Sequence, residues 1–167
     1  MSRLVTIQID KQYLKFSSGH FTIFSATSRE RLHGHNFAVR ASVTFPVDDT
    51  GISFDYKVFK DAMRSVCDRL DEYTLIAANS KHLTIEEDGE FYKIWHDNKY
   101  MLLRQDETIL LPIFNTTIEE FSSYVLNDLL SDKSMIDDND VRFVSVGVSS
   151  GPGQWADSTW SKNNEND

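Results

Sequence analysis

The sequence predicts an α+β fold in which an antiparallel β-sheet carries two helices on one face. Three observations predict it: alternating polar and apolar residues over 4–16 and 36–45, helical spacing of apolar residues in two segments, and an apolar strand at 141–148. The order strand, strand, helix, short strands, helix, strand is typical of a sheet covered on one side. At 167 residues the chain has the length of one ordinary domain.

Two long strands begin the chain. The alternation from Leu4 to Phe16 predicts the first, and Asn36 to Phe45 predict its antiparallel partner after a loop at about 24–31. A turn at 48–51 then ends the second strand.

Helical spacing follows in two places. Asp55 is the expected N-cap of the first helix, and Thr116 or Thr117 that of the second, because Glu119 and Glu120 follow in the capping-box arrangement. The expected apolar faces are Phe59, Met63, Val66, Cys67 and Leu70 in the first helix, and Phe121, Tyr124, Val125 and Leu129 in the second. Between the helices, shorter strand-like pieces at 91–95 and 108–111 predict an inserted β-hairpin region.

Three histidines form the main candidate site. His33 and His35 are two residues apart on a predicted strand, so their imidazoles point to the same face, and His20 lies at the end of the neighbouring strand. Three nitrogen ligands with an open fourth position are typical of catalytic zinc, and the single Cys67 cannot supply a closed structural site. The alternative is a pair of half-exposed strand histidines that bind no metal.

Charge and composition limit the class of protein. The formal net charge of −9 argues against a nucleic-acid surface, which needs clustered Lys and Arg. The chain has no apolar stretch long enough for a signal peptide or a membrane span, and one cysteine fits a reducing compartment, so a cytoplasmic protein is expected. We expect a single domain over 1–160 and a disordered polar tail over 161–167.

Six short segments are similar to one known family: residues 16–21, 32–37, 51–56, 70–72, 115–119 and 151–154. They resemble the 6-pyruvoyl-tetrahydropterin synthase and 6-carboxy-tetrahydropterin synthase family, most specifically in His33-Gly34-His35-Asn36 with an upstream strand histidine. The resemblance implies the tunnelling fold, in which the sheets of several subunits join into a barrel. It also implies a hexamer made of two trimers, with active sites between subunits.

The resemblance further implies that His20, His33 and His35 hold zinc and that the substrate is 7,8-dihydroneopterin triphosphate. Zinc would bind the side-chain hydroxyls of this substrate and lower their pKa, and a general base would collect the protons. The family's catalytic cysteine is replaced here by Arg29, which stays protonated and cannot act as a base.

Glu30 is the candidate base. A branch of the family that lacks the cysteine has a glutamate three residues before His-Gly-His, matching Glu30, and releases 6-hydroxymethyl-7,8-dihydropterin. Burial or nearby charge would have to raise the pKa of this carboxyl towards neutrality. The alternative is a loop charge that pairs with Arg29 or Arg31.

The relay position also departs from the family. Most relatives have Leu-Asp-His where this chain has Leu70-Asp71-Glu72, so Asp71 and Glu72 are either a proton relay or a solvated helix end. His82 and His96 lie in polar sequence and are expected to be ordinary surface histidines.

The pterin pocket shows a third departure. Ser150 takes the place of the glutamate that anchors the pterin ring, and its uncharged hydroxyl would bind the ring more weakly or in another arrangement. Asp157 would replace that glutamate only if the chain folds back, which is not expected. Thr117 and Glu119 match the Thr-x-Glu element of the family's pterin pocket, although helix capping explains them equally well.

The resemblance, together with the three departures from it, leaves three possible functions. The first is a zinc-dependent lyase that acts on a pterin triphosphate, with a small molecule and copies of itself as its partners and neither nucleic acid nor membrane. The second is a catalytically silent zinc-binding paralogue that binds a ligand or partner. The third is an enzyme with an altered, non-pterin substrate.

Overall fold

A six-stranded mixed β-sheet forms the body of the computed structural model, which describes residues 3–162. In the order in which they lie side by side, the strands are β7 (Thr108–Leu111), β3 (Thr74–Ala77), β1 (Arg3–His20), β2 (His33–Val47), β8 (Phe143–Ser149) and β9 (Ala156–Ser161). The predicted α+β class is confirmed. The purely antiparallel sheet is wrong, because β3 pairs in parallel with both β1 and β7.

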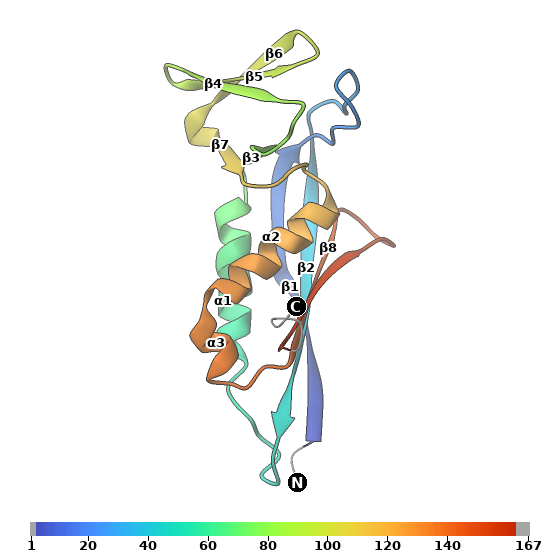
Figure 1. Ribbon diagram of the computed structural model, residues 1–167, viewed down its shortest axis with the longest axis vertical. Coiled ribbons are helices and arrows are strands. Elements are labelled where there is room, and N and C mark those ends of the chain that lie inside the picture. Colours follow the sequence, from blue (N-terminus) through green and yellow to red (C-terminus); the bar gives the residue numbers. More distant parts are fainter. Residues whose placement is uncertain (1–2, 163–167) are drawn as a thin grey trace.

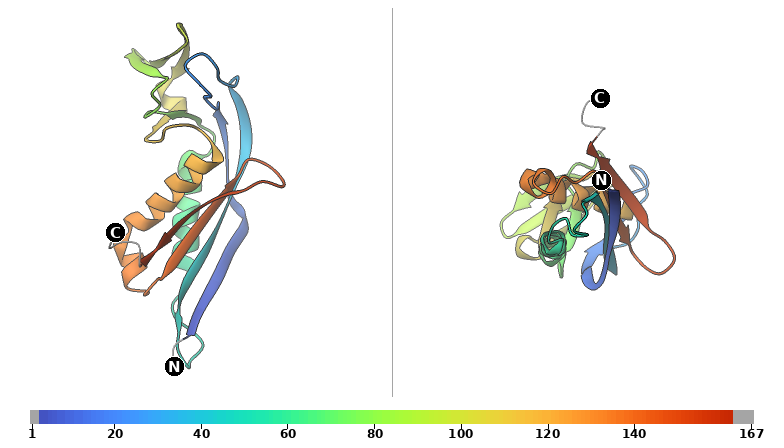
Figure 2. Two further views of the ribbon diagram at one scale, coloured as in Figure 1. Left: turned by 45° about the vertical axis from the view of Figure 1, so that its right-hand side comes forward. Right: turned by 90° about the horizontal axis from the view of Figure 1, so that it is seen from below.

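Helices cover one face of this sheet, as Figures 1 and 2 show. They are α1 (Lys57–Leu70), α2 (Ile118–Ser131) and the short α3 (Lys133–Asp137). The predicted apolar faces of α1 and α2 are buried against the sheet, apart from Tyr124, which is half-buried. The sequence thus predicted both long helices and the face that each one buries.

The predicted N-cap is confirmed for α2 and is wrong for α1. Thr117 caps α2, since its side chain accepts from the backbone N–H of Glu120. Asp55 is not the N-cap of α1. The helix begins after Tyr56, and Asp55 instead accepts a 2.9 Å hydrogen bond from the N–H of Lys57.

A second, three-stranded antiparallel sheet lies beyond the end of β1 that carries His20 (Figure 1). Its strands are β4 (Thr84–Asp88), β5 (Phe91–His96) and β6 (Lys99–Arg104), followed by a 3₁₀ turn, η1 (Gln105–Glu107). Ile94 of β5 packs with Phe21, Ile23 and Ile76 in a small apolar cluster. The predicted hairpin region is therefore a meander, and it packs against the segment that follows His20. The predicted piece at 108–111 does not belong to it, because it forms β7 of the main sheet.

Both long strands reach further than predicted, and this extension builds the candidate site. β1 continues four residues beyond Phe16, and β2 begins three residues before Asn36. Antiparallel pairing places His20 opposite His33. All three histidines consequently belong to one regular stretch of sheet.

β9 is a strand that we did not predict. It returns antiparallel to β8 and brings Asp157 opposite Gly147, where its carboxylate lies 3.2 Å from the guanidinium of Arg40. A Cβ atom at Gly147 would lie 2.5 Å from Asp157 Oδ1, so glycine leaves the room for this ion pair. The expectation that the chain does not fold back is therefore wrong. Asp157 forms a salt bridge with Arg40 on the sheet face opposite the helices.

The ordered part of the chain extends further than predicted, into the expected tail over 161–167. Ser161 is the last residue of the strand, and Lys162 donates its backbone N–H to Arg142 and its ammonium to Asp140. Disorder from residue 161 is thus wrong for these two residues. The remainder of the expected tail, 163–167, lies outside the described residues.

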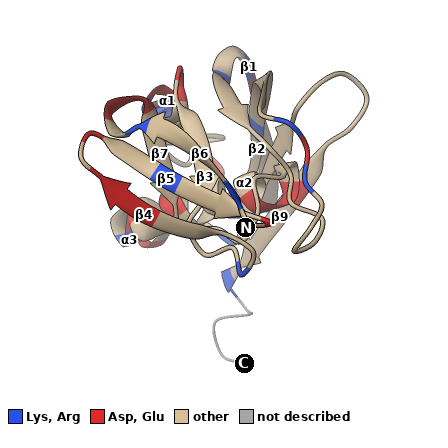
Figure 3. Ribbon diagram, turned by 90° about the horizontal axis from the view of Figure 1, so that it is seen from above, with Lys and Arg blue, Asp and Glu red and all other residues tan. Residues whose placement is uncertain are grey.

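Charges of both signs are spread over the described elements, with an acidic β4 (Figure 3). None of the helices in residues 3–162 is long and apolar enough to cross a membrane.

Candidate metal centre

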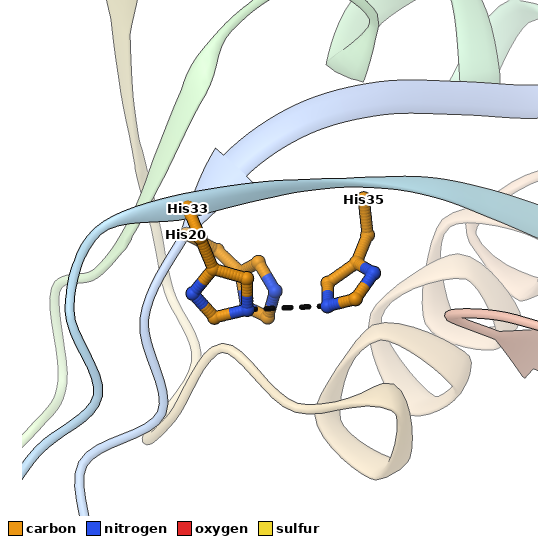
Figure 4. Close-up of side chains that lie close together, drawn as sticks. All are labelled: His20, His33 and His35. Atoms are coloured by element: carbon orange, nitrogen blue, oxygen red, sulfur yellow. Dashed lines mark hydrogen bonds between the residues drawn. The ribbon is translucent and has the colours of Figure 1, made fainter.

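His20, His33 and His35 bring their ring nitrogens together on the helix-covered face of the sheet (Figure 4). One nitrogen from each ring lies within 4.8 Å of the other two, and the Nε2 atoms of His33 and His35 are 3.1 Å apart. Among residues 3–162 no other group of three metal-ligating side chains comes this close. The structure thus assembles the three predicted histidines into one cluster.

Backbone carbonyls orient two of the rings. Nδ1 of His20 donates to the carbonyl oxygen of Thr116 at 2.8 Å, and Nδ1 of His33 donates to that of Arg31 at 2.7 Å. A proton held on Nδ1 leaves Nε2 with a free lone pair, which is the arrangement of histidines that bind metals. Both rings therefore direct an unprotonated nitrogen into the cluster.

The burial of His20 gives the clearest sign that a cation fits. Its Nε2 is buried and has no hydrogen-bond partner among the described residues, and such orphaned atoms are rare in native structures. Burial lowers the pKa of His20 below its usual value. The ring is therefore neutral near pH 7 and able to donate its lone pair, so the three nitrogens suit zinc.

A cluster of aromatic rings packs against two of the histidines. Phe37 is fully buried, with its ring stacked on Phe16 at 4.9 Å between centroids and edge-on to Phe121 at 5.0 Å. The same Phe37 ring lies 5.2 Å from the ring of His20 and 5.8 Å from that of His35. These contacts restrict the rotamers of two candidate ligands.

Glu30 lies beside the histidines. Its Oε2 accepts a 2.9 Å hydrogen bond from the N–H of Thr22, and its own N–H donates to the Thr22 carbonyl at 2.8 Å. Desolvation raises the pKa of Glu30, but the bonds from Thr22 and the nearby His33 and His20 outweigh it, so the pKa lies below its usual value. The rise towards neutrality, which was a condition for an efficient base, is therefore not found, and Glu30 is an ionised carboxylate at neutral pH, able to accept a proton.

The alternative for Glu30, an ion pair with Arg29 or Arg31, is not formed among the described residues. Arg29 donates to the backbone carbonyl of Glu30 at 2.7 Å, and its guanidinium lies 4.6 Å from the centroid of the Phe21 ring. Arg31 contributes its backbone carbonyl to His33. Arg29 therefore stabilises the loop in the place where the family has its cysteine.

Asp71 and Glu72 do not belong to the cluster of histidine rings within one chain. Asp71 is the C-cap of α1, and its carboxylate accepts a 2.6 Å hydrogen bond from the N–H of Ser17. Glu72 lines a cavity of about 380 Å³ together with Ser17 and Asn36. Because side chains alternate along a strand, Ser17 and Asn36 point to the face opposite His20 and His35. Glu72 thus reaches the face of the sheet opposite the histidine rings, while Asp71 lies at the edge of β1.

The residues predicted for the pterin pocket take separate places. Thr117 caps α2 beside the histidine cluster, while Glu119 is exposed in the first turn of that helix. Ser150 directly follows β8 and accepts a 3.2 Å hydrogen bond from the side chain of Gln154. Its hydroxyl is thus engaged within its own turn.

Sequence reasoning missed two residues that shape the site. Asn115 and Thr116 precede α2 and bond to the segment that follows His20. The similar segment 115–119 and the candidate cap at Thr116 or Thr117 marked this stretch, but neither signal indicated these hydrogen bonds. The expectation of a surface position is wrong for His96. It is 8% exposed, and its Nε2 donates to the carbonyl of Ser25 at 2.9 Å. His82 is half-buried and takes no part in the cluster.

The chain is similar to known proteins over nearly its whole length. The model of the 6-pyruvoyl tetrahydropterin synthase family matches residues 8–160. A relative in Methanocaldococcus jannaschii, provisionally named 6-carboxy-5,6,7,8-tetrahydropterin synthase, is 26% identical over 144 residues, which cover 86% of this chain and 88% of that protein.

Solved structures agree with this match. The 6-pyruvoyl tetrahydropterin synthase of Plasmodium falciparum has a TM-score of 0.89 at 28% identity, covering 95% of this chain and 98% of its own. The enzyme of the same name from Plasmodium vivax has a TM-score of 0.89 at 27% identity, covering 95% and 99%. Two further structures of the P. vivax enzyme carry alanine or cysteine in place of a glutamate described as a catalytic residue.

Proposed function

Since the chain belongs to the 6-pyruvoyl tetrahydropterin synthase family, we propose that it is a zinc-dependent lyase acting on 7,8-dihydroneopterin triphosphate or a closely related pterin. The product we assign to it is 6-hydroxymethyl-7,8-dihydropterin. The observation that carries this proposal is the position of Glu30 beside the cluster of His20, His33 and His35. A metal site with an ionised carboxylate next to it has the two parts that proton removal from a bound hydroxyl requires.

The three histidines would hold the zinc through the nitrogens that converge in the cluster. When bound, zinc would lower the pKa of the substrate's side-chain hydroxyls and polarise the carbonyl that develops. The hydrogen bonds from His20 to Thr116 and from His33 to Arg31 would keep both rings in the ligating tautomer.

Glu30 would take the proton from the hydroxyl on the second carbon of the substrate side chain. That carbon becomes an aldehyde, the bond to the first carbon breaks, and its electron pair passes to the adjacent imine of the dihydropterin ring. The first carbon then receives a proton, and the triphosphate leaves on the two-carbon fragment. The catalytic glutamate named for the P. vivax enzyme supports a carboxylate in this role.

Asp71 and Glu72 would act on a site other than that of their own chain. Neither carboxylate belongs to the histidine cluster of its own chain, so a relay through them would require a neighbouring subunit, which fits the hexameric tunnelling assembly that the family resemblance implies. Thr117, Glu119 and Ser150 would line the pterin pocket, with Ser150 contributing a neutral hydroxyl.

The position of Ser150 favours a second candidate, a zinc-holding relative that binds a ligand without turning it over. An uncharged hydroxyl already engaged with Gln154 offers the pterin ring less than a carboxylate would. The same feature would suit an enzyme whose substrate is not a pterin.

One incubation separates these candidates. Zinc-loaded protein is mixed with dihydroneopterin triphosphate, and the products are identified by mass. We expect 6-hydroxymethyl-7,8-dihydropterin, formed about 100- to 10,000-fold more slowly in Glu30→Gln with zinc content unchanged, and formed at the wild-type rate in Glu87→Gln, a matched change at an exposed position of β4. Zinc binding without any turnover would contradict the lyase and favour the silent relative.

A further inference from the structure

Asn115 makes both of its amide hydrogen bonds to one backbone position in the segment after His20. The N–H of Ile23 donates to Oδ1 of Asn115 at 3.0 Å, and Nδ2 of Asn115 donates to the carbonyl of Ile23 at 2.8 Å. Oδ1 also accepts from the N–H of Thr116 at 3.0 Å. This side chain thus takes the place of a neighbouring strand and satisfies both backbone groups of Ile23.

The hydrogen bonds continue from Ile23 to the candidate base. Ile23 forms an isolated bridge with Arg29, and Thr22, the residue before it, exchanges hydrogen bonds with the backbone and the carboxylate of Glu30. A displacement of Ile23 would therefore move Thr22 and, with it, the carboxylate of Glu30.

Thr116, the residue after Asn115, bonds to His20 and to the residue that follows it. The carbonyl of Thr116 accepts the hydrogen bond from His20, and the hydroxyl of Thr116 donates to the carbonyl of Phe21 at 2.7 Å. Thr117 caps α2. Residues 115–117 consequently tie both a candidate ligand and the loop of the candidate base to the start of one helix.

We infer that Asn115 is a positioning residue, which holds Glu30 in the orientation towards the metal cluster that proton transfer requires. This inference rests on the proposed function for the role of Glu30. Asparagine suits the position because its short side chain both accepts and donates, whereas aspartate has no N–H and alanine has neither group. A misplacement of about 1 Å in a catalytic group can lower kcat about 100-fold.

A double-mutant cycle tests the inference on the assembled, zinc-loaded protein. Asn115→Ala should lower kcat by about 10- to 100-fold and change KM by less than about 3-fold, with zinc content unchanged. In a Glu30→Gln background the same substitution should cause no further loss, because its effect passes through Glu30. Asn139→Ala is the matched control, since its amide donates to a backbone carbonyl, that of Met135, at the end of α3. An equal fold-loss in both backgrounds would overturn the inference.

Hydrogen exchange supplies a readout that needs no turnover. Backbone amides in residues 21–31 should exchange faster in Asn115→Ala than in the wild type or in Asn139→Ala, and unchanged exchange would overturn the inference. Asn115→Asp keeps the acceptor but sets a carboxylate oxygen against the carbonyl of Ile23, so it should show an effect of the same kind and serves if the alanine variant does not fold. If the wild type shows no turnover, the proposed function fails and the exchange result alone decides whether Asn115 positions this loop.

Discussion

Nε2 of His33 lies 3.1 Å from Nε2 of His35, and the two rings come from alternate residues of one strand. Two nitrogens of a tetrahedral zinc site with Zn–N distances of about 2.0–2.1 Å are about 3.3 Å apart. The two rings therefore already stand close to the separation that such a site requires. Little rearrangement of β2 is needed for the pair to share one ion.

Phe37 should be the core residue on which the site depends most. Phe37→Ala should lower the free energy of unfolding by about 3–5 kcal/mol, because it removes a fully buried ring from between Phe16 and Phe121. Phe114→Ala, which removes a ring that is 69% exposed, should change it by much less, about 0.5 kcal/mol. Urea denaturation of the two variants measures this difference, and equal losses would contradict the packing described.

The stability of the metal-free protein should fall in mild acid. Burial lowers the pKa of His20 below its usual 6.5, so the unfolded chain binds a proton more readily than the folded one. The contribution of His20 to stability is then present above about pH 6.5 and is lost as the pH falls through the folded-state pKa. Thermal unfolding after chelation, followed from about pH 7.5 to 5, should show a smaller fall in Tm for His20→Gln than for the wild type. An unchanged slope in that variant would assign the effect to other groups.

Cys67 should be inert and should not replace the family's missing cysteine. Burial in α1 raises the pKa of the Cys67 thiol to about 12, so about one thiol in 10,000 is ionised near pH 8. Iodoacetamide should leave the folded protein unlabelled and should label it fully in guanidinium chloride. Rapid labelling of the folded chain would show that the thiol is accessible.

Local patterns predicted the parts of the fold that have strong periodicity. Alternation along the strands predicted that His33 and His35 share a face, and helical spacing predicted the buried faces of α1 and α2. The four residues of β3 and of β7 are too few to show a period, so their parallel pairing could not be predicted. β9 was missed because Ala156–Ser161 is mostly small and polar, and it becomes a strand only through pairing with β8.

The sequence predicted the ligands of the candidate site but not the groups that orient them. Its ligands follow from strand geometry, but the carbonyls that orient His20 and His33 come from Thr116 and Arg31, which no side-chain pattern marks. The lowered pKa of Glu30 results from hydrogen bonds with Thr22 that form only when the loop closes. The burial of His96 likewise depends on the packing of the meander against that loop.

Zinc content tests the central claim most directly. The purified wild-type protein should hold one zinc ion per chain after dialysis against metal-free buffer. Inductively coupled plasma mass spectrometry measures this content. His20→Ala, His33→Ala and His35→Ala should each fall below about a tenth of that amount, since two nitrogens bind zinc far more weakly than three. His82→Ala, outside the cluster, should keep its zinc. A wild-type protein without zinc, or zinc retained in all three cluster variants, would contradict the account.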